Sequence, residues 1–184
     1  GTGVESIQIT KGAGSVVNGY ESISGQINTE LLKPLKDIPF FLNAYGSTDS
    51  RFELNTHFTK KISDKWATSL FLHGNTRVAK NDMNHDHFLD NPLGKQINVT
   101  NRWQYSNAET GWVSFFNLKF MKDEKQTGEL DFDKKRDKLT TNFWGSEINT
   151  ERLDFTSKIG YVFKDMPYQS IGFQNAFSNH NQDS

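Results

Sequence analysis

From residue 37 to residue 184, the chain alternates apolar and polar side chains in segments of about ten residues, the pattern of half-buried strands. The apolar positions of successive segments are Phe52, Leu54, Thr56 and Phe58; Trp66, Thr68, Leu70 and Leu72; Ile97, Val99, Asn101, Trp103 and Tyr105; Trp112, Ser114, Phe116, Leu118 and Phe120; Leu153, Phe155, Ser157, Ile159, Tyr161 and Phe163; and Ile171, Phe173, Asn175 and Phe177. With a further strand at residues 40–47, this predicts an all-β fold of about seven antiparallel strands.

The connections between these strands are unequal in length. Tight turns are expected at residues 62–64, 106–109 and 164–167, whereas residues 77–95 and 121–149 are expected to form long polar loops. Short and long connections alternate along the chain. Residues 48–50 are short, although they fall at a position where a long connection is expected. Brief turns at one rim and long loops at the other are typical of an outer-membrane β-barrel, although soluble β-sandwiches also have unequal loops.

Aromatic residues are frequent, at 13% of the chain, although the hydrophobic content is low, at 34%. Trp66, Trp103, Tyr105 and Trp112 all fall beside the expected short turns, as aromatic residues do at a membrane–water interface. The alternative is that they pack at the end of a soluble β-core. The opposite faces of the strands carry Asn55, His57, Ser69, His73, Asn98, Arg102, Asn117, Lys119, Asp154 and Lys158, which we expect to line a wet lumen.

Composition excludes several other classes of protein. The net charge of -1 and the scattered basic residues give no surface for nucleic acid. Cysteine is absent, and no apolar stretch is long enough for a membrane helix. The chain also has no nucleophile elbow and no isolated acid–base pair, so we do not expect an enzyme.

The first residues have a different texture, rich in Gly, Ser, Val and Ile. The segment VESIQITKGAGSVVNGYESISGQIN resembles the end of the plug domain of TonB-dependent outer-membrane receptors. The matching residues are Val4, Glu5, Ile7, Lys11, Gly12, Ser15, Gly19, Gly25, Ile27 and Asn28. Ala13 and Ser24 depart from the family pattern, where Pro and Gly are frequent. A phosphate-binding loop is the rival interpretation, but the terminal Gly-Lys-Ser/Thr is missing.

The later segment DMNHDHFLDNPLGKQINVTNRWQY is similar to receptors of this family from Bacteroidetes-type bacteria. The resemblance implies that residues 1–36 form the C-terminal part of a plug and residues 37–184 the first strands of a 22-stranded transmembrane barrel, with the boundary at residues 33–37. It implies a location in the bacterial outer membrane, among its lipids. Its ligand would be a scarce small molecule or metal complex, such as a ferric siderophore, haem or cobalamin.

In such receptors a TonB-type energy-transducing protein pulls on a box that precedes the plug, and this box is not in the sequence. Seven strands cannot close a barrel of this kind, so the chain is interpreted as a fragment of the transporter.

One loop carries a candidate metal site. Asp82, Asn84, Asp86 and Asp90 occupy positions 1, 3, 5 and 9 of an EF-hand-like loop, whose oxygens would suit Ca²⁺. Against calcium, His87 stands where the EF-hand has Gly, and Leu93 stands where it has Glu. Solvated carboxylates in a polar loop are the alternative. His85 and His87 in this loop, and His57 and His73 on the strands, are candidate ligands of a transition metal. Solvated histidines are the alternative.

The charged residues 122–138 are expected to form a solvated, mobile loop. The alternative to a receptor is a soluble or surface-attached β-rich module for calcium binding or adhesion.

Overall fold

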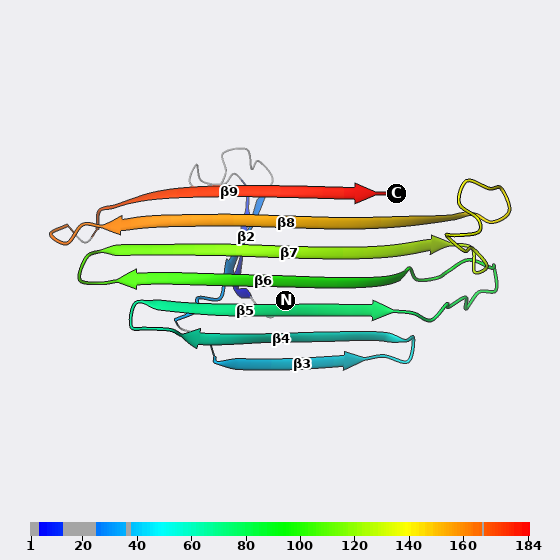
Figure 1. The fold of residues 1–184 in the computed structure, drawn as a ribbon, viewed down its shortest axis with the longest axis horizontal. Helices are drawn as coiled ribbons and strands as arrows, with labels where there is room; N and C mark the ends of the chain where they lie inside the picture. Colours follow the sequence, from blue (N-terminus) through cyan, green and yellow to red (C-terminus); the bar gives the residue numbers. More distant parts are fainter. Residues whose placement is uncertain (1–3, 13–24, 36–37, 167) are drawn as a thin grey trace.

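The computed structural model describes residues 4–12, 25–35, 38–166 and 168–184, and these form only antiparallel β-structure and loops (Figure 1). A hairpin of β1 (Val4–Lys11) and β2 (Gly25–Leu31) precedes a seven-stranded sheet. In the described residues, no helix has the length and apolar character to cross a membrane. The all-β class and the antiparallel arrangement expected from the sequence are confirmed.

The seven-stranded sheet is a meander in which each strand pairs with the next along the chain. Its strands are β3 (Phe40–Gly46), β4 (Arg51–Lys61), β5 (Trp66–Arg77), β6 (Leu93–Asn107), β7 (Trp112–Gly128), β8 (Gly145–Val162) and β9 (Ser170–Asp183). Short connections join the strands at one end of the sheet. The other end, which we call the outer end, carries two long loops, residues 78–92 and 129–144, and the short β3–β4 connection at residues 47–50 (Figure 1). β3 and β9 each have one neighbour, so the sheet is open and its closure into a barrel stays a prediction.

The expected loop at residues 121–149 is wrong in extent. β7 continues to Gly128 and β8 begins at Gly145, so only residues 129–144 connect them. Charges that suggested a loop are paired on the strands instead. Lys122 Nζ lies 2.9 Å from Glu151 Oε1, directly opposite in the ladder, and Lys125 pairs with Asp123 within β7. Opposite charges at facing positions stabilise a sheet, so a strand can extend beyond its apolar part.

The ladder of the seven-stranded sheet runs from β3 to β9 without a shift in register, which keeps each face of the sheet uniform. One row crosses all seven strands as Phe40, Phe58, Leu70, Asn101, Leu118, Phe155 and Phe177. We call the side of the sheet that carries this row the apolar face. The other side, the polar face, carries the polar residues that the alternation predicts, among them Arg102 opposite Asn117 and Lys119 opposite Asp154.

Burial in this sheet is the reverse of that in a globular core. The described residues include two buried hydrophobic side chains, Ala67 and Phe132. The polar face meanwhile buries Asn55, His57, Ser69 and Gln104. Apolar-face residues stay open, with Leu42, Phe52, Leu118 and Phe177 at 57%, 56%, 48% and 62% exposed. The apolar face therefore needs a cover that these residues do not supply.

Aromatic rings gather where the apolar face meets the short turns. Trp66 packs against Tyr105 with ring centroids 5.0 Å apart, and Trp112 packs against Tyr161 at 5.1 Å. Phe163 extends this cluster, 5.2 Å from Tyr161. Trp66, Trp103, Tyr105 and Trp112 are expected here from their positions beside turns, and the structure adds the Tyr161–Phe163 pair.

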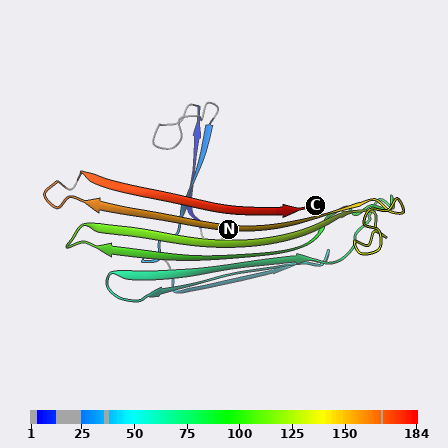
Figure 2. The same ribbon diagram turned by 45° about the horizontal axis from the view of Figure 1, so that its top comes forward.

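The β1–β2 hairpin projects from the polar face of the sheet (Figure 2). Its register places Lys11 opposite Gly25 and Asn28 opposite Gln8, while Glu5 lies at a bulge between Val4 and Ser6. Gly12 has a φ of +86°, a backbone conformation that glycine adopts without strain. Of the residues in the plug-like motif, Ser15 and Gly19 lie outside the described residues, as do Ala13 and Ser24.

Gly111 gives a test of the turn that sets the β6–β7 register. Its φ is +80°, and a Cβ added there would lie 2.2 Å from the carbonyl oxygen of Val162. Gly111→Ala should lower the free energy of unfolding by about 1–3 kcal/mol, measured by denaturant titration, because backbone strain and the steric clash act together. Gly172→Ala is the matched control, since the nearest atom to its added Cβ is 3.8 Å away. Equal stability of the two variants would contradict this account of the turn.

Candidate functional site

The polar face carries a continuous hydrogen-bonded network across β4, β5 and β6. Asn55 Nδ2 donates to Glu53 Oε1 at 2.9 Å, which leaves Asn55 Oδ1 to face His73 Nδ1 at 2.6 Å. Asn75 Nδ2 lies 3.1 Å from His73 Nε2 and donates to Gln96 Oε1 at 2.8 Å. The network holds five polar side chains in fixed positions on the wall of the sheet.

The direction of these bonds assigns a tautomer to His73. Asn75 Nδ2 can only donate, so His73 Nε2 accepts, and His73 Nδ1 carries the proton that it donates to Asn55. The imidazole is thus a structural member of the network. His57, in the same face, is 2% exposed and lies between the rings of Phe41 and Phe71, with centroids 5.4 and 5.2 Å away.

The base of the β1–β2 hairpin is held by the polar face of β6. The Arg102 guanidinium donates a hydrogen bond to the carbonyl oxygen of Leu32, and Gln104 Oε1 accepts one from the backbone N–H of Leu35 at 3.3 Å. Both bonds use backbone atoms of residues 32–35, so they fix the path of the chain as it leaves the hairpin. The sequence placed Arg102 on this face but gave no sign of what it binds.

The two long outer loops, residues 78–92 and 129–144, are joined to each other. The Leu130 N–H donates to the His87 carbonyl at 2.8 Å, and the Leu89 N–H donates to the Gly128 carbonyl at 2.9 Å. The Phe88 and Trp144 rings lie 6.1 Å apart. The loops therefore contact each other at the outer end of the sheet.

The four candidate calcium ligands, Asp82, Asn84, Asp86 and Asp90, lie in the first of these loops. Asp82 accepts backbone hydrogen bonds from Asp86 and His87 at 3.1 and 3.0 Å, and Asp90 Oδ2 accepts one from Met83 at 2.7 Å. Asn84 Nδ2 donates to Asp86 Oδ2 at 2.9 Å. His87 has a φ of +68°, so it adopts the left-handed conformation for which the EF-hand uses glycine.

These carboxylates thus close the loop on itself. The bond from the Phe88 N–H, followed by that from Asn84, lowers the pKa of Asp86 below its ordinary value. Across the described part of the chain, no group of three or more His, Cys, Asp or Glu side chains has the arrangement of a metal site. Calcium binding by Asp82, Asn84, Asp86 and Asp90 stays a prediction from spacing, and His85 is not drawn into a ligand set.

The second loop is built around Asp137, whose side chain is fully buried. It accepts two bonds from the Arg136 guanidinium, at 2.9 and 2.7 Å, and one from the backbone N–H of Asp133 at 2.9 Å. Arg136 also lies over the Phe143 ring at 5.2 Å. These contacts join residues 131–143 to one another, and the expected mobility of the loop stays a prediction.

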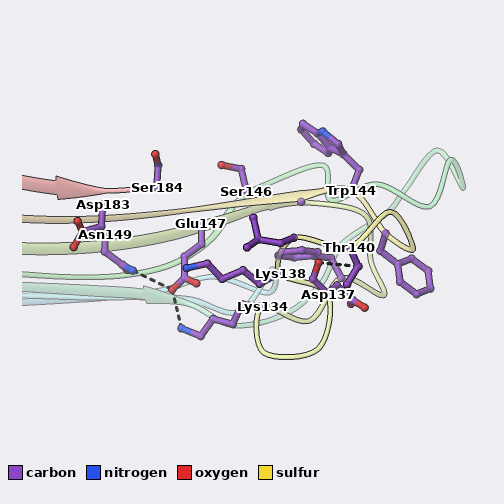
Figure 3. Close-up of a pocket in the computed structure, with 14 residues that line it drawn as sticks. Lys134, Asp137, Lys138, Thr140, Trp144, Ser146, Glu147, Asn149, Asp183 and Ser184 are labelled. Atoms are coloured by element: carbon purple, nitrogen blue, oxygen red, sulfur yellow. Dashed lines mark hydrogen bonds and ion pairs between the residues drawn. The ribbon is translucent and has the colours of Figure 1, made fainter.

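A cavity of about 330 Å³ lies between this loop and the start of β8 (Figure 3). Glu147 is its polar centre, because Lys134 Nζ and Asn149 Nδ2 both donate to Glu147 Oε1, at 2.7 and 3.2 Å. The acid and the cations in this cavity neutralise each other, so it offers no charge of one sign to a ligand.

Comparison of the chain with protein-family models, with curated proteins and with solved structures finds no match.

Asp137 makes the outer loop sensitive to acid. The Arg136 hydrogen bond, and then that from Asp133, holds the pKa of Asp137 below its ordinary value. A depressed folded pKa means that the stabilisation is present above the ordinary pKa and is lost as pH falls through the lower, folded value. We expect hydrogen exchange in residues 129–144, corrected for intrinsic rates, to accelerate over that acidic window.

The Asp137→Asn variant should show faster exchange in this loop already at neutral pH, because the charge-assisted pair with Arg136 is lost. Asp131→Asn, in the same loop, is the control and should match the unsubstituted protein. A loop that exchanges equally in the Asp137→Asn variant and the control would contradict the role given to Asp137.

Proposed function

We propose that this chain is part of a TonB-dependent outer-membrane receptor, in which β3–β9 belong to the barrel wall and β1–β2 to the plug. The observation that carries the proposal is the reversed burial of the sheet, with an exposed apolar face and a polar face that holds hydrogen-bonded side chains. A lipid cover for the apolar face and a wet lumen on the polar face account for both.

The dimensions of the apolar face support a membrane cover. On β7 it runs from Trp112 to Phe120, about 27 Å along the strand at about 3.4 Å per residue. A strand tilt of about 40° would reduce this to a height of about 21 Å, near the ~25 Å apolar band of outer-membrane barrels. Beyond Phe120, the same face turns charged with Lys122 opposite Glu151.

The position of the hairpin supports the assignment to a plug. Its contacts with the sheet reach Arg102 and Gln104, both on the polar face, which would be the inside of a barrel. In a β-sandwich the two sheets pack through their apolar faces, and the hairpin would have no reason to lie on the other side. The parent receptor would be coupled to a TonB-type protein and would take up a metal complex or another scarce small molecule.

Neighbouring positions on β7 give a direct test, because the chain has no cysteine of its own. Leu118→Cys and Lys119→Cys would each carry a spin label in the chain reconstituted in lipid. We expect lipid-soluble oxygen to reach the label at 118 and a water-soluble nickel chelate to reach the label at 119. A label at Glu124→Cys, on the same side as Leu118 but beyond Phe120, should be open to nickel.

The outcome separates three structures. If the label at 118 were shielded from both reagents, the apolar face would be covered by protein, as in a sandwich. If nickel reached 118 and 119 alike, the face would be exposed to water. Either result would overturn the receptor proposal.

The plug assignment has its own test at Arg102. Arg102→Met removes the charged donor to Leu32, and a hydrogen bond from a charged group contributes about 1.5–3 kcal/mol, so protection of the hairpin amides should fall about tenfold or more. Hydrogen exchange of residues 25–35 measures this. Lys158→Met, on the polar face of β8, should leave their exchange unchanged. Unaltered exchange in Arg102→Met would count against an anchor at this residue.

A further inference from the structure

Three basic side chains stand in one cross-strand row at the outer end of the polar face. Arg51 on β4 is directly opposite Arg77 on β5, Arg77 is opposite Gly94 on β6, and Gly94 is opposite Lys125 on β7. Like charges at directly facing positions destabilise a sheet, so the pairing of Arg51 with Arg77 contributes nothing to folding by itself. Such a row is explained more readily by something that it binds.

The row borders a hollow of about 220 Å³, which we call the basic hollow. Its lining includes Arg51, Asn75, Arg77, Gln96, Asp123 and Lys125. Gly94 has no side chain to fill the gap between Arg77 and Lys125, and a Cβ there would already lie 3.1 Å from the Glu124 carbonyl oxygen. Backbone atoms therefore form the bottom of the hollow between Arg77 and Lys125.

Hydrogen-bond donors outnumber acceptors in the basic hollow. The acids near it are already paired: Asp123 with Lys125 at 2.8 Å, Glu53 with Arg51 at 3.1 Å and Asp49 with Arg77 at 3.1 Å. Each guanidinium has five N–H donors, so an arginine that pairs with one carboxylate still has N–H groups free to bind another acceptor. Arg77 Nε is buried and, among the described residues, has no hydrogen-bond partner.

The amides beside the row add to this excess. Asn75 donates to Gln96 Oε1, which orients the Gln96 side chain, and the Gln96 NH₂ group adds two donors beside the row. Asn75 is in turn fixed by His73. The network on the polar face thus holds donors in place beside the basic row.

We propose that the basic hollow binds an anionic oxygen group, a carboxylate or a phosphate, on a small ligand. Such a group supplies the acceptors that the hollow lacks, and arginine binds both groups through paired N–H donors. The placement of this site at the outer mouth of the lumen rests on the proposed receptor function, whereas its chemistry rests on the residues alone. Within that function, the site would select ligands that carry a negative charge.

Calorimetric titration of the full chain in detergent, at low ionic strength, tests the proposal with inorganic phosphate and with succinate. We expect saturable binding of at least one of them, weakened about tenfold or more in Arg77→Gln because a hydrogen bond between charged groups is lost. Lys125→Gln should weaken it in the same direction, and its exposed side chain makes it a safe second variant if Arg77→Gln fails to fold. Lys158→Gln should bind as the unsubstituted chain does.

Binding of succinate alone would identify a carboxylate ligand, and binding of phosphate alone a phosphate. Absence of saturable binding for both anions, or equal affinity in all variants, would overturn the proposal. The spin-label experiment on β7 does not involve these residues. A membrane topology without anion binding would leave the receptor proposal standing, and anion binding in a water-soluble chain would leave the basic hollow standing without the receptor.

Discussion

The unbroken register of the seven-stranded ladder is the constraint on which the other features depend. Because side chains alternate with a period of two, a slip of one residue at any pair would move a whole strand's apolar side chains to the other face. The row from Phe40 through Leu118 to Phe177 stays on one side across six successive pairings. The separation into an apolar and a polar face, and every argument about what covers each, follows from that alignment.

The same register organises the chemistry of the polar face into rows. Glu53, Asn75, Gln96 and Asp123 face one another in one row, and Arg51, Arg77, Gly94 and Lys125 in the row beside it. Acids at the ends of the first row pair with the outer cations of the second, and Arg77, which pairs with Asp49 outside both rows, lies in the middle with the two amides. A donor-rich centre with a glycine gap is therefore a property of the sheet, and no single strand contains it.

At the outer end, the loops are joined by contacts with each other. Leu130 bonds to the backbone of His87, and the buried Asp137 draws Arg136 and Asp133 around it. A carboxylate without exposure to water costs free energy unless it is paired, and here the pairing is what shapes the loop. The candidate calcium ligands are used in the same way, as acceptors for backbone N–H groups of their own loop.

The sequence by itself determined the seven strands of the larger sheet, its two faces, the short turns and the end at which aromatic residues gather, because each depends on local periodicity and turn residues. For residues 122–138 the sequence predicted a loop throughout, although β7 continues to Gly128. A charged strand cannot be distinguished from a charged loop until the facing strand is known. Arg102 bonding to Leu32, the junction of the two outer loops and the basic row were decided only by tertiary structure. Each joins residues that are far apart in the chain, and only the pairing of strands sets which of them meet.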